Sequence, residues 1–464
     1  MRLDRGHRAT MGRMPEAGPR RRRALAYPLL AAVTALGLLA AGCGASPSRS
    51  DPGSSHAGST GTSGDSRPAA RYVRCMREHG IANFPNPVDG GIQLRPGSGV
   101  DPSSAAFKAA EAACKALAPQ GTSGASGSSP RDWSTFATWL RQRAAAGDFS
   151  GVVLVAKDRK PILTQADGLA DRARQTPNTP DTRFNVASIG KMFTAVAIAQ
   201  LAQQGRVSFN DPISRYLPGF PAGIGDKITI AELLTHTSGL GDVFQRWHPT
   251  ASPLSVSQLL RKIENEPLQF EPGSRFSYSN SGFVVLGAII EAVTGQNYYD
   301  WVRAHVFEPA GMANTGWYAL DQVPNMAHGY VPVRQAGKPV AFQDAHGAGV
   351  GGNPSGGAYS TVGDLLRFAQ ALLGHKLLSA AMTNTVLSGK VDTGRPGPGE
   401  DKYAYGFADS RINGVRIVGH NGGTLGYEGQ LDIYPDRGYT VVMLTNQDRV
   451  LAPALQRSQA ILTR

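Results

Sequence analysis

The chain has 464 residues and a formal net charge of +12, which is enough length for one large domain with smaller appendages. The positive charge is concentrated in residues 1–50, where nine arginines stand against two acidic residues, and the rest of the sequence has no long run of Lys and Arg. A nucleic-acid partner therefore has little support, because the basic segment has a different explanation.

Residues 1–42 have the order of charge and apolar side chains that is typical of a signal peptide. Arg20–Arg23 precede "ALAYPLLAAVTALGLLAAGC", an apolar stretch that ends in small residues at Cys43. The stretch is about as long as a membrane helix, so an uncleaved anchor is one alternative. Plain secretion after cleavage is the other. "LAAGC" resembles a bacterial lipobox, which implies that Cys43 is lipidated and holds an exported protein at the outer face of the cytoplasmic membrane.

A small two-cysteine unit is expected between two linkers. Residues 43–68 and 120–130 are rich in Ser, Gly and Pro, which indicates flexible tethers. Residues 69–119 between them are too few to build much core alone. With lipid on the first cysteine of the chain, Cys75 and Cys114 remain in an oxidising compartment, and we expect them to form a disulfide. The unit resembles a small module of actinobacterial exported proteins, and its expected role is a spacer or a cell-wall contact.

Residues 131–464 are expected to form one domain with strands at both ends. "WSTFATWLRQRAAAG" predicts an amphipathic helix, and "GVVLVAKDRKPILTQADG" predicts a β-hairpin. Near the C-terminus, Asn413-Gly414 and Asp436-Arg437-Gly438 are typical hairpin turns, and a final helix is predicted at 451–463. The region between these ends alternates helical patterns with Gly- and Pro-rich loops. This order predicts an α+β fold, in which both termini build one antiparallel sheet around a largely helical middle region.

A serine and a lysine stand three residues apart at the start of one predicted helix. "RFNVASIGKMFTAVAIAQLAQQG" (183–205) contains Ser188 and Lys191, and the helix is apolar on most faces. A lysine buried in a first helical turn meets desolvation and the positive end of the helix dipole, and both lower the pKa of its ammonium group. An easily neutralised lysine can activate an adjacent serine as a nucleophile. The alternative is that Ser188 only caps the helix and Lys191 extends to water.

Two later segments carry further polar motifs. "FSYSNSGFVVLGAII" places Tyr278 and Asn280 in a loop before a buried helix predicted at 282–294, and "VGHNGGTLG" places His420 at the end of a strand. Together with "LLTHTSGL" and "GGAYSTVGDLLRFAQALL", the ordered motifs resemble the serine β-lactamase and DD-peptidase superfamily, in its class C β-lactamase-like, penicillin-binding branch. The resemblance covers roughly residues 148–448 and implies the β-lactamase/transpeptidase-like fold.

The resemblance implies a role for each residue that matches a motif. Ser188 is the nucleophile that becomes acylated, and Lys191 accepts or relays its proton. Tyr278 is the partner base and can protonate the leaving group, provided that nearby cations favour its phenolate or share its proton. The backbone N–H groups of Ser188 and Gly423 form the oxyanion hole, and Gly422 lets the strand approach the substrate closely.

The same resemblance assigns the substrate side of the site. Asn280 binds the acyl amide of the substrate and steadies the lysine. His420 stands where the family most often has the lysine of Lys-Thr-Gly, and Asn421 stands in place of the threonine. A mostly neutral imidazole holds a substrate carboxylate less firmly than an ammonium group does. The two departures therefore argue against efficient β-lactamase activity and leave esterase or D-amino-acid peptidase chemistry open.

Other polar residues have structural interpretations. His236 and Thr237 are expected to shape a loop beneath the site, and Tyr359 and Ser360 to line the cleft wall or close a turn. The sequence contains no His-Glu-x-x-His motif or clustered ligand spacing, no Gly-rich phosphate loop and no Gly-x-Ser-x-Gly elbow. We therefore expect neither a metal nor a cofactor.

These observations predict a lipid-anchored serine hydrolase that forms an acyl-enzyme with a small-molecule or cell-wall peptide substrate. D-Amino-acid peptides, β-lactam-like compounds and small esters share this mechanism and differ only in the pocket that they need. The alternative from another class is a penicillin-binding or peptidoglycan-binding sensor that has lost turnover. The sequence favours the enzyme, because decayed members of the family usually lack one residue of the set Ser188, Lys191, Tyr278 and Asn280.

Overall fold

The computed structural model describes residues 68–85, 100, 104–114, 117, 130–246, 255–317, 320–334, 340–346, 352–395 and 400–464. The predicted signal peptide, Cys43 and almost all of both predicted linkers lie outside these residues. The chain divides into two compact units, Met1–Gly121 and Thr122–Arg464, and each is described by itself. No helix in the described ranges is long and apolar enough to span a membrane.

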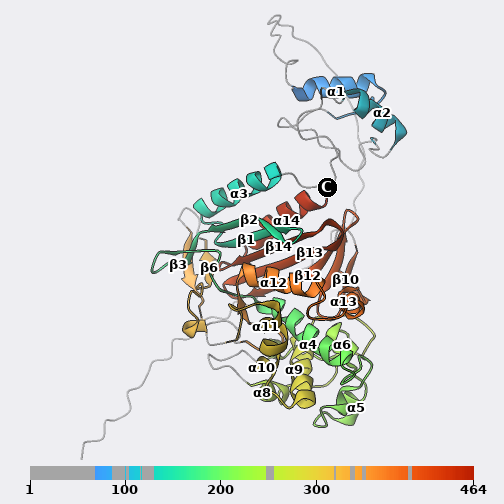
Figure 1. Ribbon diagram of the computed structural model, residues 1–464, viewed down its shortest axis with the longest axis vertical. Coiled ribbons are helices and arrows are strands. Elements are labelled where there is room, and N and C mark those ends of the chain that lie inside the picture. Colours follow the sequence, from blue (N-terminus) through green and yellow to red (C-terminus); the bar gives the residue numbers. More distant parts are fainter. Residues whose placement is uncertain are drawn as a thin grey trace, which may run out of the picture. The chain divides into compact units, whose positions relative to one another are not determined.

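The first unit contains two helices joined by a disulfide. Helices α1 (Pro68–Glu78) and α2 (Ala105–Cys114), coloured blue in Figure 1, are linked by a bond between Cys75 and Cys114. The buried side chains of this unit include Tyr72, Met76, Phe84 and Phe107. Among the described residues, the one grouping of potential metal ligands is these two cysteines with His79, and its sulfurs are already bonded to each other.

The second unit is built on one antiparallel sheet that takes strands from both ends of the chain. Within the described residues this sheet has eight strands in the order β2-β1-β14-β13-β12-β11-β10-β9, so β1 lies between its hairpin partner β2 and the last strand β14. The predicted α+β fold is thereby confirmed. The strands of the sheet are β1 (Gly151–Lys157), β2 (Lys160–Asp167), β9 (Val391–Asp392), β10 (Asp401–Tyr403), β11 (Ala408–Ile412), β12 (Val415–Thr424), β13 (Tyr427–Tyr434) and β14 (Tyr439–Thr445).

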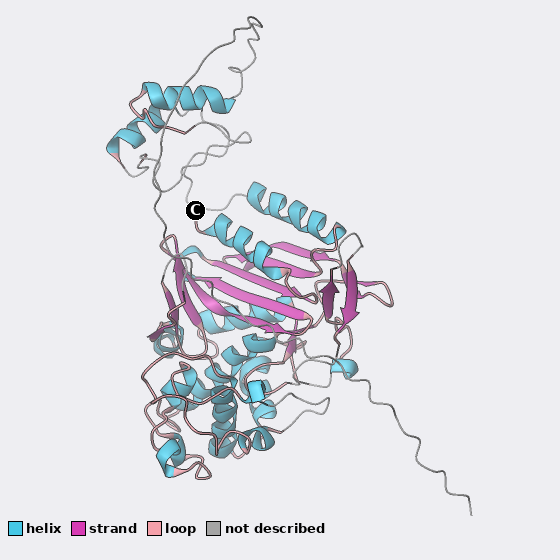
Figure 2. Ribbon diagram, turned by 180° about the vertical axis from the view of Figure 1, so that it is seen from behind, coloured by secondary structure: helices cyan, strands magenta, loops and turns pink. Residues whose placement is uncertain are grey.

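Helices cover both faces of this sheet (Figure 2). Successive side chains of a strand point to opposite faces. Val153 and Val155 of β1 therefore pack with α3 (Pro130–Ala145) and α14 (Leu451–Leu462), while Val152 and Leu154 pack into the core of the helical region. Both faces are buried, which explains why β1 is a continuous apolar run rather than an alternating one.

The helical region lies against the sheet face opposite α3 and α14, and at its centre α4 and α9 pack together (Figure 1). Both helices are almost wholly buried, as their apolar sequences predict. The helices of this region are α4 (Lys191–Gln203), α5 (Ala222–Gly225), α6 (Ile230–Leu234), α7 (Val243–Arg246), α8 (Val256–Leu260), α9 (Asn280–Thr294), α10 (Tyr298–Val302), α11 (Glu308–Ala310), α12 (Val362–Leu373) and α13 (Ala380–Leu387). The short strands β3 (Leu169–Asp171) and β4 (Thr176–Pro177) pair with each other, as do β5 (Phe184–Asn185) and β8 (Tyr359–Ser360), and β6 (Tyr330–Val333) and β7 (Ala341–Asp344).

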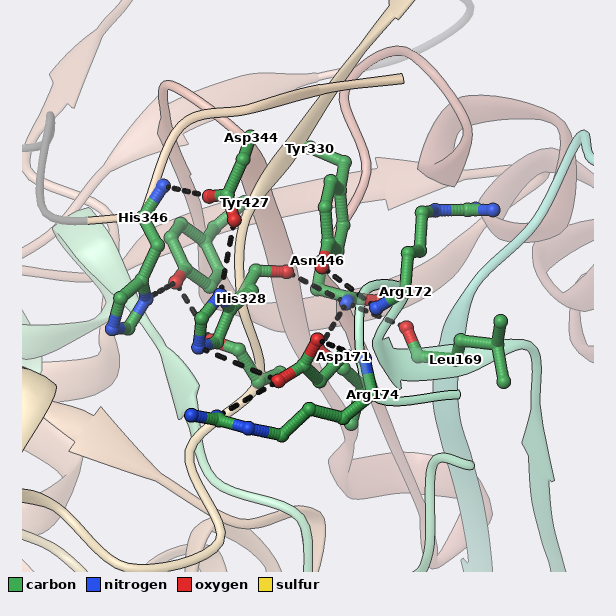
Figure 3. Close-up of polar contacts among 12 residues, drawn as sticks. Leu169, Asp171, Arg172, Arg174, His328, Tyr330, Asp344, His346, Tyr427 and Asn446 are labelled. Carbon is green, nitrogen blue, oxygen red and sulfur yellow. Dashed lines mark hydrogen bonds and ion pairs between the residues drawn. The ribbon is translucent and has the colours of Figure 1, made fainter. Parts of the chain in front are cut away.

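A polar cluster holds the β6–β7 hairpin against the end of the sheet (Figure 3). The rings of His328 and His346 stack with their centroids 4.0 Å apart, and His328 Nδ1 lies 3.1 Å from a carboxylate oxygen of Asp344. His346 Nδ1 lies 3.1 Å from the hydroxyl of Tyr427, and Asn446 Nδ2 donates to the carbonyl oxygen of His328. The fold therefore pairs two histidines that the sequence shows only as scattered residues.

Candidate active site

Ser188 lies in a tight turn rather than in the helix that follows it. A 3₁₀ turn at Ala187–Gly190 connects β5 to α4, and Ala187 has a left-handed φ of 44°. The side chain of Asn185 accepts the backbone N–H of Ala187 at 2.8 Å, which stabilises this turn. Gly190 is the N-cap residue of α4, and no side chain caps that helix. The alternative that Ser188 serves as a helix cap is therefore wrong.

Lys191 begins α4 and is completely buried, so the alternative that it extends to water is wrong as well. Its Nζ lies 2.6 Å from Asn280 Oδ1, 2.7 Å from the carbonyl oxygen of Ser355 and 3.2 Å from Ser188 Oγ. Burial lowers the pKa of Lys191 to about 7, although the negative charge of Asp242 raises it. A substantial fraction of this lysine is therefore a neutral amine at neutral pH.

The partners of Lys191 Nζ suit the neutral amine. A neutral amine has two N–H groups and one lone pair. Asn280 Oδ1 and the carbonyl oxygen of Ser355 can only accept hydrogen bonds, so they take both N–H groups. The lone pair is then left for the hydroxyl proton of Ser188, the third neighbour. This arrangement can remove the proton of Ser188 without rearrangement of the lysine.

Asn280 is held in one orientation by Asp242. The prediction that Asn280 lies in a loop is wrong, because it is the first residue of α9, which begins two residues earlier than predicted. Its Nδ2 donates to Asp242 Oδ2 at 2.8 Å, so its Oδ1 must face Lys191. Asp242, which stands two residues after "LLTHTSGL", was not predicted as a site residue. Ser355 was not predicted either, because it contributes a backbone carbonyl and therefore leaves no side-chain signal.

Tyr278 lies near Ser188, and Lys191 Nζ lies 4.8 Å from the centre of its ring. Burial raises the pKa of the Tyr278 phenol well above its ordinary value, although its interaction with Ser188 lowers it. The phenol is therefore protonated in the free protein. This state suits a proton donor or relay, whereas the phenolate that a base would require is disfavoured.

The serine, lysine, tyrosine and asparagine of the predicted motifs thus lie together in the structure. Comparisons with known proteins show the family to which the chain belongs. A family described as Beta-lactamase matches residues 136–463. The chain belongs to this family. It is 32% identical to "Penicillin-binding protein 4*" of Bacillus subtilis over 65% of this chain and 68% of that protein. It is 31% identical to "Esterase EstB" of Burkholderia gladioli over 66% of this chain and 87% of that protein.

Solved structures place the fold in the same group. A penicillin-binding protein from Bacillus halodurans superposes with a TM-score of 0.63 at 30% identity, over 70% of this chain and 98% of that chain. The matched family spans nearly all of the second unit and none of the first. The protein is therefore a member of the β-lactamase/transpeptidase-like serine hydrolase superfamily, with penicillin-binding proteins and esterases among its relatives.

His420 stands where the resemblance places the lysine of Lys-Thr-Gly, and its surroundings in the structure keep it neutral. It is 3% exposed, and its Nδ1 lies 2.5 Å from the carbonyl oxygen of Asn421 while its Nε2 lies 2.8 Å from the hydroxyl of Tyr403. A carbonyl only accepts, so Nδ1 carries the proton and Nε2 accepts from Tyr403. Burial and then the nearby Lys191 lower the pKa of His420 to about 3. Both ring nitrogens are occupied, and the residue supplies no positive charge.

Gly422 and Gly423 lie on the part of β12 that faces the serine turn. Strand β11 pairs with β12 only as far as Gly419, and the residues of β12 beyond it approach the serine turn. A Cβ on Gly422 would lie 2.2 Å from the carbonyl oxygen of Val186, which is why only glycine fits there. Gly423 lines a cleft of about 80 Å³ together with Ser188, and its remaining lining residues are Asn185, Ala187, Phe244, Asn280, Asn353, Ser355, Gly356, Gly357 and Thr424.

A larger cavity of about 310 Å³ begins next to this cleft. Asp242 and Ser281, which flank the amide of Asn280, form part of its wall, and Leu240, Gly241, Val243, Lys262, Ile263 and Glu266 complete it. The small cleft gives access to Ser188, and the larger cavity is the size of a binding site for a small molecule.

The remaining sequence-predicted residues have structural positions. His236 lies beneath the tyrosine, with its ring centre 4.3 Å from that of Tyr278, as the loop-shaping interpretation expects. Thr237 is buried and hydrogen-bonds through its hydroxyl to that of Thr235. Tyr359 and Ser360 form the buried strand β8. Neither is among the described residues that line the cleft, whereas Gly356 and Gly357 of the preceding turn are.

Proposed function

We propose that the protein is a serine hydrolase that forms an acyl-enzyme on Ser188 with an ester or amide substrate. The observation that carries this proposal is the environment of Lys191, where two acceptors take both N–H groups of the neutral amine and Ser188 Oγ lies 3.2 Å away. Membership in the Beta-lactamase family supports it, because relatives include proteins named as penicillin-binding proteins and as an esterase.

In the acylation step, Ser188 Oγ bonds to the acyl carbon while its proton passes to Lys191 Nζ. The carbonyl oxygen takes up the electron pair of the broken π bond, and the backbone N–H groups of Ser188 and Gly423 stabilise its negative charge. When the carbonyl re-forms, the bond to the leaving group breaks. The Tyr278 hydroxyl gives its proton to the departing oxygen or nitrogen, and it regains a proton from the lysine ammonium.

Deacylation reverses these proton transfers with water in place of the leaving group. Water adds to the acyl carbon while its proton passes by way of Tyr278 to Lys191, and Ser188 Oγ leaves with a proton returned from Lys191. Asn280 holds the amine in place during both steps, because its amide is fixed from the other side by Asp242.

The proposed substrate class follows from the charge state of His420. His420 is neutral and both of its nitrogens are engaged, so it offers no cation for a substrate carboxylate. A neutral ester or amide is therefore the preferred substrate. D-Amino-acid peptides and β-lactams stay within the proposed class as weaker substrates, because their recognition usually includes a carboxylate.

The proposal is tested with the full-length protein and its Ser188→Ala variant. We expect the wild-type protein to hydrolyse p-nitrophenyl butyrate and the variant to lose this activity by a factor on the order of 10⁴. An active Ser188→Ala protein would refute the mechanism. Intact mass measured during incubation with benzylpenicillin separates the alternatives: a persistent penicilloyl adduct without ester turnover would instead indicate a penicillin-binding sensor.

We also propose that the protein acts outside the cytoplasm on a lipid anchor at Cys43. The Arg20–Arg23 run, the apolar stretch and the lipobox-like "LAAGC" support this location. The disulfide between Cys75 and Cys114 supports it too, since such bonds persist in oxidising compartments. Metabolic labelling with a radioactive fatty acid should label the wild-type protein, whereas a labelled Cys43→Ser variant would contradict the anchor.

A further inference from the structure

His236 is buried, strained and incompletely hydrogen-bonded. It is 1% exposed, its φ is 59°, and its Nε2 has no hydrogen-bond partner within the described part of the chain. A left-handed backbone is unfavourable for most residues with a Cβ, and a buried N–H without a partner costs free energy. A histidine at this position therefore costs stability, which suggests that its ring makes contacts that a smaller side chain could not make.

The ring and backbone of His236 clamp the segment that carries Tyr278. Its Nδ1 accepts the backbone N–H of Ser279 at 3.1 Å, and its carbonyl oxygen accepts the backbone N–H of Ser277 at 2.8 Å. The two residues flanking Tyr278 are thus both bound to His236. Since a backbone N–H only donates, Nδ1 must be the acceptor and the proton of the neutral ring resides on Nε2.

The same ring forms the floor under the tyrosine. Its centre lies 4.3 Å from that of Tyr278, with the planes tilted by 34°, and 4.7 Å and 5.2 Å from those of Tyr403 and Phe283. Burial, followed by the nearby Lys191, lowers the pKa of His236 well below its ordinary value. The neutral ring keeps its acceptor, whereas an imidazolium would have none for Ser279.

We propose that His236 is a positioning residue that fixes the Tyr278 phenol against Ser188, so that protonation of the leaving group depends on it. The inference rests on the proposed function, in which Tyr278 donates that proton. It goes beyond the loop-shaping role because it assigns His236 to one chemical step. If this is correct, a change at His236 harms substrates with poor leaving groups far more than substrates whose leaving group needs no proton.

Two esters with the same acyl group separate that step from general damage. p-Nitrophenolate leaves without a proton, whereas the alkoxide of ethyl butyrate requires one. His236→Phe keeps a ring and removes the acceptor, while His236→Asn places Oδ1 where Nδ1 lies and tolerates the left-handed backbone. We expect His236→Phe to lower kcat/KM for ethyl butyrate by at least about tenfold more than for p-nitrophenyl butyrate, and His236→Asn to recover most of that selectivity.

A double-mutant cycle with Tyr278→Phe completes the test. Residues that act through one another are not additive. In the Tyr278→Phe background, His236→Phe should therefore cause no further selective loss against ethyl butyrate. Equal losses for the two esters, or full additivity with Tyr278→Phe, would overturn the proposal. If His236→Phe does not fold, His236→Gly replaces it, because glycine accepts the left-handed backbone and also lacks the acceptor.

An activity-independent measurement distinguishes failure of this inference from failure of the proposed function. Hydrogen exchange of the Ser279 backbone amide should be slow in the wild-type protein and in His236→Asn, and fast in the variant without an acceptor. If the wild-type protein hydrolyses neither ester, the proposed function fails and the exchange pattern alone decides the positioning claim. Equal protection of this amide in all three proteins would refute it.

Discussion

Asp242 is expected to set the pH at which acylation begins. Lys191 must be neutral to accept the proton of Ser188, and burial lowers its pKa to about 7 while the charge of Asp242 raises it. Replacing Asp242 by Asn removes the negative charge but keeps an oxygen that can accept from Asn280 Nδ2. The pKa of Lys191 should therefore fall further, so the acidic limb of the pH profile of kcat/KM should move to lower pH.

The geometry gives the size of the expected shift in the pKa of Lys191. Lys191 Nζ lies 2.6 Å from Asn280 Oδ1, and Asn280 Nδ2 lies 2.8 Å from Asp242 Oδ2, so one amide group separates the two charges. At a separation of about 7 Å and an effective dielectric constant of about 20, Coulomb's law gives about 2 kcal/mol, or between one and two pKa units. At pH 6, about a tenth of the wild-type lysine is neutral if its pKa is about 7. More than half of the lysine should be neutral at that pH in Asp242→Asn.

The assay is kcat/KM for p-nitrophenyl butyrate measured between pH 5 and pH 9, which reports ionisations of the free enzyme. Asp344→Asn is the matched control, because it removes a carboxylate that belongs to the His328 cluster and is absent from the charges that act on Lys191. We expect its acidic limb to coincide with that of the wild-type protein. A midpoint in Asp242→Asn that stays in place or moves to higher pH would refute the electrostatic argument.

Two further substitutions test the packing of the site and of the first unit. Gly422→Ala should abolish ester hydrolysis and lower the midpoint temperature of unfolding, because the new Cβ would lie 2.2 Å from the Val186 carbonyl oxygen. Gly423→Ala is the control: its Cβ would have no neighbour within 4 Å, so its unfolding midpoint should equal that of the wild-type protein. A Gly422→Ala protein with normal activity and stability would contradict this. Cys114→Ser should expose the first unit to proteolysis, since the lost cross-link contributes about 4 kcal/mol on the chain-entropy model, and should leave ester hydrolysis unchanged. Equal protease resistance with and without the disulfide would argue against that contribution.

The sequence predicted the fold because its main signals are local. The apolar run of β1, the turns at Asn413-Gly414 and Asp436-Arg437-Gly438 and the final helix each depend on neighbouring residues, and each is found. The start of α9 was misplaced because Ser279 and Asn280 are as common in loops as in first helical turns. The pairing of His328 with His346 was missed because it is created by the packing of the β6–β7 hairpin rather than by a local motif.

The candidate site was predictable only as far as side-chain motifs extend. The four ordered residues Ser188, Lys191, Tyr278 and Asn280 share one environment in the structure, joined by contacts that no spacing rule contains. Ser355 acts through a backbone carbonyl, so any residue at that position would give the same sequence signal. The charge states also escape sequence reasoning, because they depend on burial, which the fold alone determines.

The neutrality of His420 belongs to the same electrostatic arrangement as the neutrality of Lys191. A lysine at position 420 would place a second cation beside a buried amine that must lose its own proton near neutral pH. In this protein, Tyr403 and the Asn421 carbonyl engage both nitrogens of His420, so the ring is neutral and cannot oppose the charge on Lys191. The nearest counter-charge for the lysine is then Asp242, which acts through Asn280. A site balanced in this way activates its serine without a cation at position 420, and this is the reason for proposing neutral esters and amides as its preferred substrates.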